Sequence, residues 1–551
     1  MFNLKAGYFY LLAVRILSWR FIKQLYFNTS YYNNSLKTKT PEKLYFYPNP
    51  YLLSSFINQK IFNFKLSKID EENFWTHHKD PKEEEALNSF FWLNLINRKN
   101  SGLVVQQIIT NWINLNKKYN HKTWNSLNTS KRVLAWLLNA DIILNHGDKS
   151  FRDKFFNSII SQVNHLKKIL NSEHDPVKKI EIISAIILSG LVFKDYNNNF
   201  EIGLKLLKNI VEDFFDNDGA PISRDIYDLV QCSKFLIIIK ECCRDAQEYI
   251  PDYLDDIVQK IVVCVYSLKN PTDKSPLFNG ASEFKLDTYL EYLDGLNYKP
   301  KELLKKVSNI FIVRGKKNLL FFDIGSPPKR TYSNNYQLGP LSFEYFNEGK
   351  KIITNCGYGH KISRKLEFIS RLTSAQSTLT LNDTSVLNFE KNNLVYEAFG
   401  STISSSFKVF DFKENDENNY LTLSAKHDAY KDKFNYVHER TIKIDKKTND
   451  LFGEDNLTTD HMGSKTDNFY HIRFHLYPGV NAVQTMGKNS ILVQIDKSKS
   501  LIFKANEENL SLEKSIFLGR NKIVNNFCIT ITGILEKNKN KTIKWELKRN
   551  N

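Results

Sequence analysis

The sequence predicts an α+β multidomain protein in which an all-α half is followed by an antiparallel β half. From residue 87 to about 310, apolar residues recur every three or four positions, the period of a helix that buries one face. From about Asn318 the period falls to two, which is the period of a β-strand. The 551 residues are too many for one core. We expect a lead-in over residues 1–75, a helical domain over 76–315 and a β-sandwich over 316–551.

The helical half combines amphipathic and fully apolar segments. One apolar stripe is formed by Phe151, Phe155, Ile159, Val163, Leu166 and Leu170. Residues 180–193 are apolar nearly all round, which is typical of an inner helix enclosed by others. Residues 203–215 and 226–243 continue the alternation. Helices repeated in this way predict a helical barrel or solenoid.

The β half contains many short strand-like runs separated by turn residues. These runs cover residues 319–323, 378–381, 407–412, 420–424, 491–495 and 528–534. Strands without intervening helices predict an antiparallel sandwich. The segment 325–338 has two prolines and paired asparagines, which favour an interdomain or active-site loop.

Net charge limits the classes of partner. The formal charge of +17 predicts attraction to polyanions, and an acidic polysaccharide is the partner we expect. A general enrichment in lysine and asparagine explains the same excess without a functional cause. The sequence has none of the usual nucleic-acid-binding motifs, so we expect no nucleic-acid partner. The six cysteines include no Cys-x-x-Cys pair and are expected to be buried free thiols.

The N-terminal segment allows two interpretations. Residues 7–14 are apolar, and Lys5, Arg15, Arg20 and Lys23 lie among Phe, Leu and Trp. Residues 1–25 therefore could form an interfacial helix that contacts a membrane peripherally. A helix that packs on the helical domain is the alternative. No small-residue cleavage site follows the apolar run, as a cleavable secretory signal would require.

One strand is predicted to carry basic groups on a single face. In residues 469–477, Tyr470, Ile472, Phe474 and Leu476 alternate with His471, Arg473 and His475. Because a strand repeats every two residues, the three basic side chains share a face, with neighbours about 7 Å apart. Such a face suits an anion or a metal ion. His438 and Arg440 share a strand face by the same spacing.

Several motifs occur in an order that resembles a known family. They are 218–224 (DGAPISR), 371–379 (RLTSAQSTL), 427–430 (HDAY), 438–440 (HER), 453–455 (GED) and 473–476 (RFHL). Together they resemble heparinase II/III-like proteins. The resemblance implies an (α/α) toroid followed by an antiparallel β-sandwich. It also implies polysaccharide lyase chemistry on glycans that contain uronic acid, in the cell envelope or periplasm, although a cytoplasmic location stays open.

The resemblance also implies site residues. A uronate lyase removes a proton α to a carboxylate and expels the glycosidic oxygen, so it needs groups that stabilise developing charge and groups that transfer protons. Asn164 and His165 are the candidates for the first role and Tyr227 for the second. Arg224, Arg371, Arg473 and His471 are the candidate substrate-binding residues. A solvated helix flank and a packed tyrosine ring are the alternatives for Asn164–His165 and Tyr227.

Position 376 departs from the family pattern. Related sequences carry His where this chain has Gln376, and an amide cannot shuttle protons. His360, in a glycine-flanked loop, is a substitute. A divalent metal ion, zinc or calcium, is a candidate cofactor, with His438 and His475 as ligands and no third ligand identified.

Three functions therefore remain open. The first is a polysaccharide lyase acting on an acidic glycan. The second is a non-catalytic glycan-binding or accessory protein that kept the fold, which Gln376 favours. The third is a toroid hydrolase, which needs two inward carboxylates such as Asp218 and Glu181.

Overall fold

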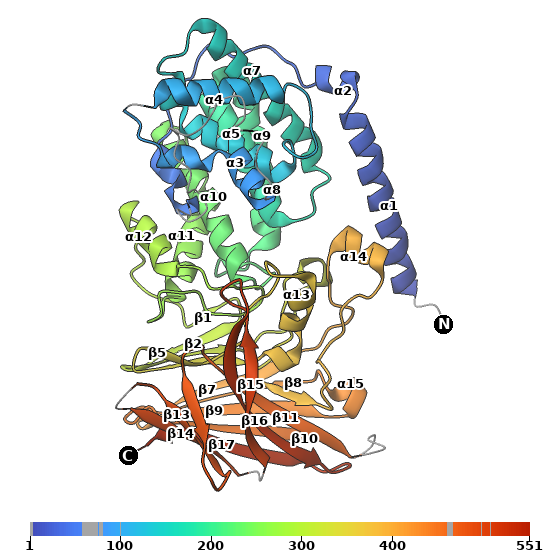
Figure 1. Cartoon of the computed structure of the whole chain (residues 1–551), viewed down its shortest axis with the longest axis vertical. Helices are drawn as coiled ribbons and strands as arrows, with labels where there is room; N and C mark the ends of the chain where they lie inside the picture. Colours follow the sequence, from blue (N-terminus) through green and yellow to red (C-terminus); the bar gives the residue numbers. More distant parts are fainter. Residues whose placement is uncertain are drawn as a thin grey trace.

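The computed structural model describes residues 4–57, 75, 81–99, 101–459, 467–496, 499–506 and 509–550. A helical domain lies at one end of the molecule and two stacked antiparallel sheets lie at the other (Figure 1). The predicted fold class is confirmed. The last helix of the helical domain is α12 (Leu286–Gly295), and the first strand is β1 (Lys306–Val307). The change thus precedes Asn318, because the first strands are too short to display a period of two.

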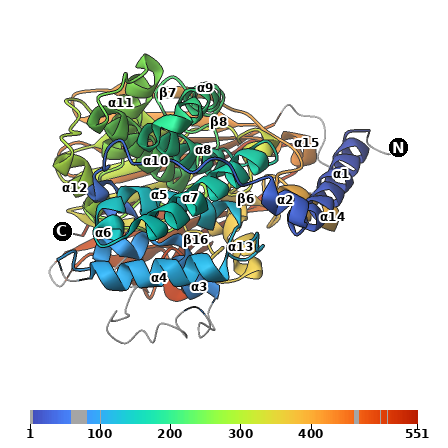
Figure 2. The ribbon, with the colours of Figure 1, turned by 90° about the horizontal axis from the view of Figure 1, so that it is seen from above.

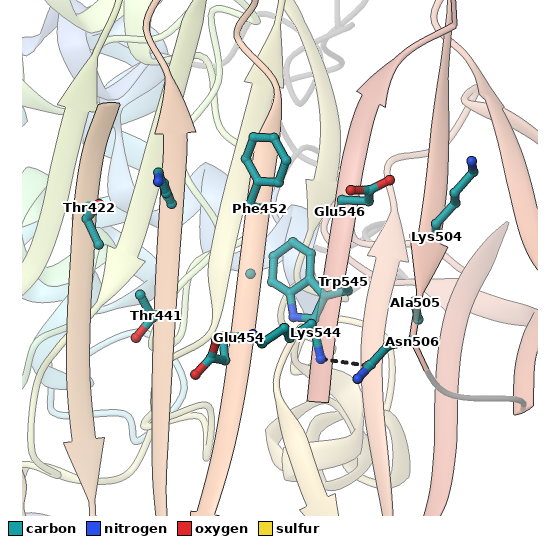
Figure 3. Close-up of a pocket in the computed structure, with 12 residues that line it drawn as sticks. Thr422, Thr441, Phe452, Glu454, Lys504, Ala505, Asn506, Lys544, Trp545 and Glu546 are labelled. Carbon is teal, nitrogen blue, oxygen red and sulfur yellow. Dashed lines mark hydrogen bonds and ion pairs between the residues drawn. The ribbon is translucent and has the colours of Figure 1, made fainter. Parts of the chain in front are cut away.

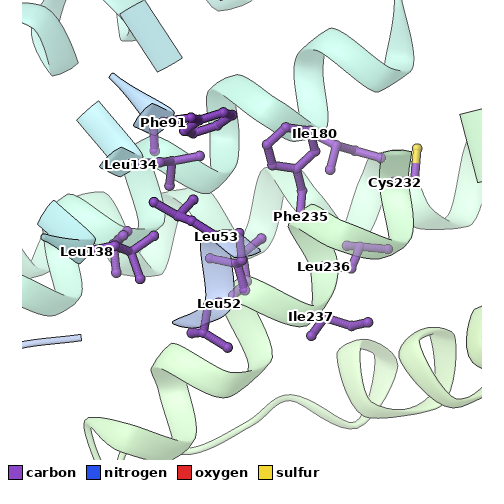
Figure 4. Close-up of a cluster of buried hydrophobic side chains, with 14 of the residues drawn as sticks. Leu52, Leu53, Phe91, Leu134, Leu138, Ile180, Cys232, Phe235, Leu236 and Ile237 are labelled. Carbon is purple, nitrogen blue, oxygen red and sulfur yellow. The ribbon is translucent and has the colours of Figure 1, made fainter. Parts of the chain in front are cut away.

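The helical domain is built from inner and outer helices. Its helices are α2 (Ser30–Asn34), α3 (Pro81–Ser89), α4 (Gly102–Leu115), α5 (Ser126–Leu138), α6 (Ala140–Leu144), α7 (Lys149–Leu170), α8 (Pro176–Val192), α9 (Asn197–Phe214), α10 (Ile226–Asp245), α11 (Asp252–Ser267) and α12. The inner helices α5, α8 and α10 contact one another and are buried along most of their length. Their side chains form the core with Leu52, Leu53 and Phe91 (Figure 4).

The C-terminal domain is a sandwich of two antiparallel sheets. The first contains β1, β2 (Ile310–Arg314), β3 (Asn318–Asp323), β4 (Phe343–Asn347), β5 (Lys350–Thr354), β6 (Leu379–Leu381), β11 (Asn468–Leu476), β15 (Asn509–Phe517) and β16 (Val524–Leu535). The second contains β7 (Val409–Asp416), β8 (Tyr420–His427), β9 (Val437–Asp445), β10 (Leu451–Thr458), β12 (Asn481–Gln484), β13 (Ser490–Gln494), β14 (Ser500–Ala505) and β17 (Lys541–Arg549). A second core fills the space between them.

The predicted alternation in β11 is confirmed over most of the strand. Tyr470, Ile472, Phe474 and Leu476 are buried, whereas His471 and Arg473 on the opposite face are partly exposed. His475, predicted to share that face, is buried. The face shared by His438 and Arg440 is also confirmed, but it is the buried face of β9. All six cysteines are free and buried, as predicted.

The first helix, α1 (Leu4–Phe27), stands beside the two domains (Figures 1 and 2). It packs along α14 (Asn393–Phe399), a short helix of the C-terminal domain, and its last turn reaches the helical domain at Phe27. The alternative of a helix packed along the helical bundle is therefore wrong for most of α1. Among the described residues, no helix combines the length and the apolarity needed to cross a membrane.

Candidate functional site

The two domains are joined by a buried arginine at the start of α10. Arg224 forms an ion pair with Asp323, and its Nε donates to the carbonyl oxygen of Ser308 at 3.0 Å. Its Nη1 donates to the carbonyl oxygens of Gly325 and Ser326. The backbone of Arg224 has a φ of 62°, which costs free energy that these contacts offset. The contacts occupy the guanidinium, so Arg224 holds the domains together and does not face a ligand.

A cavity of about 550 Å³ lies beside this junction. The helical domain contributes the start of α8, the end of α9 and the first turn of α10. The C-terminal domain contributes residues 330–335 and α14, and α1 contributes Phe9 and Arg20. Because the cavity is lined by segments far apart in the sequence, it is the natural place to look for a site.

Three side chains in the first turn of α10 face this junction. The Asp225 carboxylate caps α10 by accepting from the backbone N–H of Tyr227 at 2.7 Å, and it accepts from Asn335 Nδ2 at 2.8 Å. Asp228 accepts from Ser223 Oγ at 2.8 Å. Burial raises the pKa of Asp225 to about 7 and raises that of Asp228 well above its usual value. No lysine or arginine within the described ranges forms an ion pair with either carboxylate.

The Tyr227 side chain is exposed at the start of α10, close to several carboxylates. Its side chain is 41% exposed. Burial and the nearby carboxylates of Asp225, Asp228 and Glu181 raise its pKa to about 12. The phenol is therefore protonated at neutral pH.

Glu181 adds an unsatisfied carboxyl group to the same region. It lies on the inner helix α8 and is 4% exposed. Its Oε1 has no hydrogen-bond partner among the described residues. Burial raises its pKa to about 7, against the opposing charge of Lys131. Asp218, the other carboxylate considered for a hydrolase, is exposed in a loop, so these two do not pair.

A glycine-rich loop of the C-terminal domain faces α10. Tyr358 donates its hydroxyl to Asn335 Oδ1 at 3.1 Å, and Asn335 in turn donates to Asp225. The ring of His360 stacks on Tyr358 with centroids 4.5 Å apart. The Nζ of Lys361 lies 5.5 Å from the centre of the Tyr227 ring. The structure therefore brings the predicted residues Tyr227 and His360 to the same junction.

The charge of this region differs between its floor and its rim. The carboxylates of the floor are Asp225 and Asp228, which line the cavity together with Arg20, Lys178 and Arg330. Glu181 is buried on α8 nearby and does not line the cavity. The rim carries exposed cations from the loop before α13 (Arg364–Arg371) and its first turn, namely Lys361, Arg364 and Lys365. The net charge of +17 is therefore not reflected in the cavity, whose lining carries charges of both signs. Desolvation, with the charge of Lys361, lowers the pKa of His360 to about 4, which leaves its imidazole neutral.

Asn164 and His165 lie elsewhere, under the N-terminal segment. Asn164 Nδ2 donates to the carbonyl oxygen of Leu36 at 2.9 Å. His165 is buried, with Nδ1 2.6 Å from the Tyr32 hydroxyl and Nε2 2.9 Å from the carbonyl oxygen of Trp124. Burial lowers the pKa of His165 to about 4. These contacts anchor residues 32–38 on α7, and the structure does not bring the pair to Tyr227.

Gln376 and Arg371 are buried in the C-terminal domain and do not line the cavity. Gln376 Nε2 donates to the carbonyl oxygen of Ser370 at 2.8 Å. Arg371 donates to the carbonyl oxygens of Tyr336 and Ser333 at 2.9 and 2.8 Å. Both side chains are almost fully buried, so they shape the loop that lines the cavity and do not reach into it.

His471 and Arg473 form a cluster on the outer face of the first sheet. Both contact the carboxylate of Asp383, and Arg473 also donates to Thr380 Oγ1 at 2.8 Å. His471 lies 3.2 Å from Thr532 Oγ1. None of these partners lines the cavity. The cluster is therefore separate from the junction around Tyr227.

The two predicted metal ligands do not meet. His438 belongs to the second sheet, where Asp455 lies 2.7 Å from its Nε2 and His427 3.0 Å from its Nδ1. His475 belongs to the first sheet, where its Nε2 lies 3.0 Å from the carbonyl oxygen of Ser374. The part of the chain that the structure describes holds no group of three or more His, Cys, Asp or Glu placed to bind a metal. These residues do not fit a shared zinc or calcium ion.

A second hollow, of about 490 Å³, lies on the outer face of the second sheet (Figure 3). Phe452, Trp545, Lys443, Lys504 and Lys544 line it. Gly453 lies against the Trp545 ring, because a Cβ at this position would be 2.0 Å from the indole. The hollow contains none of the predicted site residues.

Some residues of the junction were not predicted. Asp225, Asp228 and Lys361 were missed. The available signal was the Asp-x-x-Asp spacing around Tyr227 at a helix start, where a carboxylate is expected as a cap. No local pattern predicts that Lys361 lies over the Tyr227 ring, since the two are far apart in the sequence.

Comparison with known proteins agrees with this architecture. Residues 304–546 match the family described as "Heparinase II/III-like, C-terminal". The C-terminal domain is a heparinase II/III-like domain. The match begins beside β1, so the family domain coincides with the structural one. No curated protein matches the sequence.

Solved structures with both domains are similar to this chain. Heparinase III gives a TM-score of 0.68 at 12% identity, covering 91% of this chain and 84% of that one. The Heparinase III-BT4657 gene product gives 0.64 at 16%, covering 90% and 81%. Heparan sulfate lyase HepC from Pedobacter heparinus gives 0.62 at 15%, covering 88% and 79%. At these identities the similarity establishes the fold, a toroid followed by a β-sandwich.

Proposed function

We propose that the protein is a polysaccharide lyase that cleaves an acidic, uronate-containing glycan by β-elimination at the junction of its two domains. The observation that carries the proposal is the position of Tyr227 at the start of α10, facing the loop that bears His360 and Lys361. The side chains of Tyr227 and His360 are both solvent-accessible, and these two residues belong to different domains. The lyases among the structural neighbours support the reaction class.

The arrangement suits the two proton transfers of an elimination. A base takes the proton from the carbon α to the uronate carboxylate, and the electron pair of the broken C–H bond forms the double bond. The bond to the glycosidic oxygen breaks, and that oxygen leaves with a proton from an acid. His360 is neutral at physiological pH and is therefore able to accept the proton, although its pKa of about 4 makes it a weak base. Tyr227, whose pKa is raised to about 12, stays protonated and suits the acid. Lys361, Arg364 and Lys365 on the rim would attract the anionic glycan.

The proposal is tested by incubating the protein with a panel of uronate polymers, including heparan sulfate and alginate. We expect a rise in ultraviolet absorbance from the unsaturated uronate in at least one reaction. His360→Gln should reduce that rate by about 100-fold, as removal of a proton-transfer group does. A matched control is His146→Gln, on a surface loop of the helical domain. New reducing ends without the absorbance would point to hydrolysis instead.

A non-catalytic glycan-binding protein is the second candidate, and Gln376 favours it. The position that carries an imidazole in related sequences holds an amide bonded to the carbonyl oxygen of Ser370. The carboxylates of the floor would also hinder entry of a polyanion at high pH. Binding to an acidic polysaccharide that weakens with salt, without any unsaturated product, would support this candidate.

A further inference from the structure

One face of α1 carries large apolar side chains that are exposed to solvent. The helix buries Ala13 against Val395 and Ala398 of α14, with Ile16 and Leu17 alongside. The opposite face exposes nine large side chains, with exposed fractions that reach 69% at Leu11. They are Tyr8, Tyr10, Leu11, Val14, Trp19, Phe21, Ile22, Leu25 and Tyr26.

These side chains form one continuous stripe. Leu11, Val14, Phe21 and Leu25 recur at helical spacing, and the stripe follows a helix of 24 residues, which is about 36 Å long. Figure 1 shows α1 standing beside the two domains, and Figure 2 shows it at the outer edge of the molecule. A contiguous apolar surface of this size on a folded protein marks an interaction surface.

The charges of α1 are all of one sign. Its sequence contains Lys5, Arg15, Arg20 and Lys23 and no acidic residue. Arg15 lies within the exposed face, and Lys23 flanks it with its Nζ 5.5 Å from the Trp19 ring. We infer that this face binds an anionic membrane surface, with α1 lying flat in the headgroup region.

The composition of the stripe matches that surface. Trp19 and the three tyrosines have an apolar ring and a polar group, which suits the boundary between acyl chains and water. Basic residues among apolar ones are typical of helices that lie in the interface of anionic bilayers. The uncharged run between Lys5 and Arg15 is far shorter than the about 20 residues that a membrane-spanning helix needs.

A second copy of the chain is a poorer occupant. Two α1 helices placed face to face would bring Arg15 and Lys23 of one copy against those of the other, with no carboxylate in either helix. The net charge of +17 would add long-range repulsion. An anionic lipid surface satisfies both the apolar stripe and the cations.

The docked helix would place the cavity close to the membrane. Phe9 and Arg20, on the inward side of α1, line the cavity, so the cavity would lie about one helix diameter, or about 10 Å, from the lipid surface. The idea that the substrate is a glycan held at the membrane rests on the proposed function. The docking of α1 on the membrane does not depend on it.

The test is sedimentation of the full chain with phosphatidylcholine vesicles that contain or lack phosphatidylglycerol. We expect at least about tenfold stronger binding to the anionic vesicles. The triple variant Leu11→Gln, Phe21→Gln, Ile22→Gln should lose about tenfold or more of that binding. The control variant Leu103→Gln, Val483→Gln, Ile523→Gln removes three apolar side chains that are as exposed elsewhere and should bind normally.

Three results would overturn the inference. They are failure of the parent to bind anionic vesicles, equal binding by the triple variant, and equal binding to vesicles without anionic lipid. Light scattering of the parent and of the triple variant tests whether a second copy of the chain occupies this face instead. A parent dimer that dissociates when the α1 residues are substituted would assign the face to a second copy. Lyase activity on a soluble glycan is independent of all these outcomes.

Discussion

Buried charges occur in two regions of the molecule, and their partners differ. In the sandwich, Asp455 accepts from His438, from Arg440 and from Trp545 Nε1. Burial alone would raise its pKa, but Arg440 and His438 outweigh burial and hold the pKa well below its usual range. At the start of α10, Asp225 and Asp228 have hydrogen bonds but no ion pair with a lysine or arginine that the structure describes, and their pKa values are raised.

In the sandwich network, every ring nitrogen of His427 and His438 has a hydrogen-bond partner. The backbone N–H of Ala429 donates to His427 Nδ1, so His427 Nε2 carries the proton and donates to His438 Nδ1. His438 then donates from Nε2 to Asp455. Both imidazoles are neutral and none of their nitrogens is left for a ligand. The network is structural, whereas carboxyl groups with raised pKa values beside an accessible tyrosine are typical of a functional site.

The largest effect is expected from breaking the sandwich network. Asp455→Asn leaves Arg440 buried without a countercharge, and we expect a loss of about 3–5 kcal/mol in the free energy of unfolding. Urea denaturation measures it. Asp383→Asn, which removes an exposed partner of Arg473, should cost less than about 1 kcal/mol. Equal losses in the two variants would remove the distinction between the closed network and a surface pair.

The next effect concerns catalysis at the α10 site. Tyr227→Phe deletes the hydroxyl group and should lower lyase turnover by about 100-fold or more, because the acid for the leaving group is lost. Stability should change little, since Tyr227 is accessible. The rate of formation of unsaturated product measures the effect, with Tyr249→Phe, an exposed tyrosine, as the control. Full turnover in the Tyr227→Phe variant would exclude this tyrosine as the acid.

A smaller effect is expected in the pH dependence of stability. The pKa of Glu181 is about 7 in the folded protein and near 4.5 when unfolded, so the folded state binds more protons between these values. Stability is therefore lost as pH rises through that window. Glu181→Gln removes the loss, and its stability relative to the parent should rise by about 2–3 kcal/mol from pH 4 to pH 8.

Urea unfolding of the parent and variant at several pH values measures this difference. Glu212→Gln is the control, because Glu212 is an exposed carboxylate on α9 paired with Lys208. Its difference from the parent should stay nearly flat over the same window. A flat difference for Glu181→Gln as well would mean that the carboxyl group is not held in its neutral form.

The sequence predicts the elements better than their surroundings. The alternation in β11 and the shared face of His438 and Arg440 follow from the period of a strand, which is local. Whether a strand face is exposed to solvent or buried depends on the sheet that packs against it. The partner of His438, Asp455, lies on the neighbouring strand β10. His165 illustrates the same limit, because its partners Tyr32 and Trp124 are 133 and 41 residues away.

The candidate site was predicted in part for the same reason. Tyr227 and His360 were each identified from local motifs, and the structure brings both to one junction. Their neighbourhood depends on the packing of one domain on the other, which Arg224 fixes through Asp323. The raised pKa of Tyr227 also follows from that packing, because burial and carboxylates from two helices cause it.

The smallest effect is expected at position 376. Gln376 is 1% exposed, its amide donates to the carbonyl oxygen of Ser370, and its Cγ would lie 2.8 Å from a Cβ on Gly339. Gln376→His should therefore direct an imidazole N–H at the same carbonyl group, away from the cavity. We expect turnover to stay within about threefold of the parent and stability to change by about 1 kcal/mol. The same absorbance assay measures turnover. A tenfold gain would instead mean that an imidazole at position 376 reaches the substrate. The site would then extend from Tyr227 towards residue 376 and not towards the His360 loop.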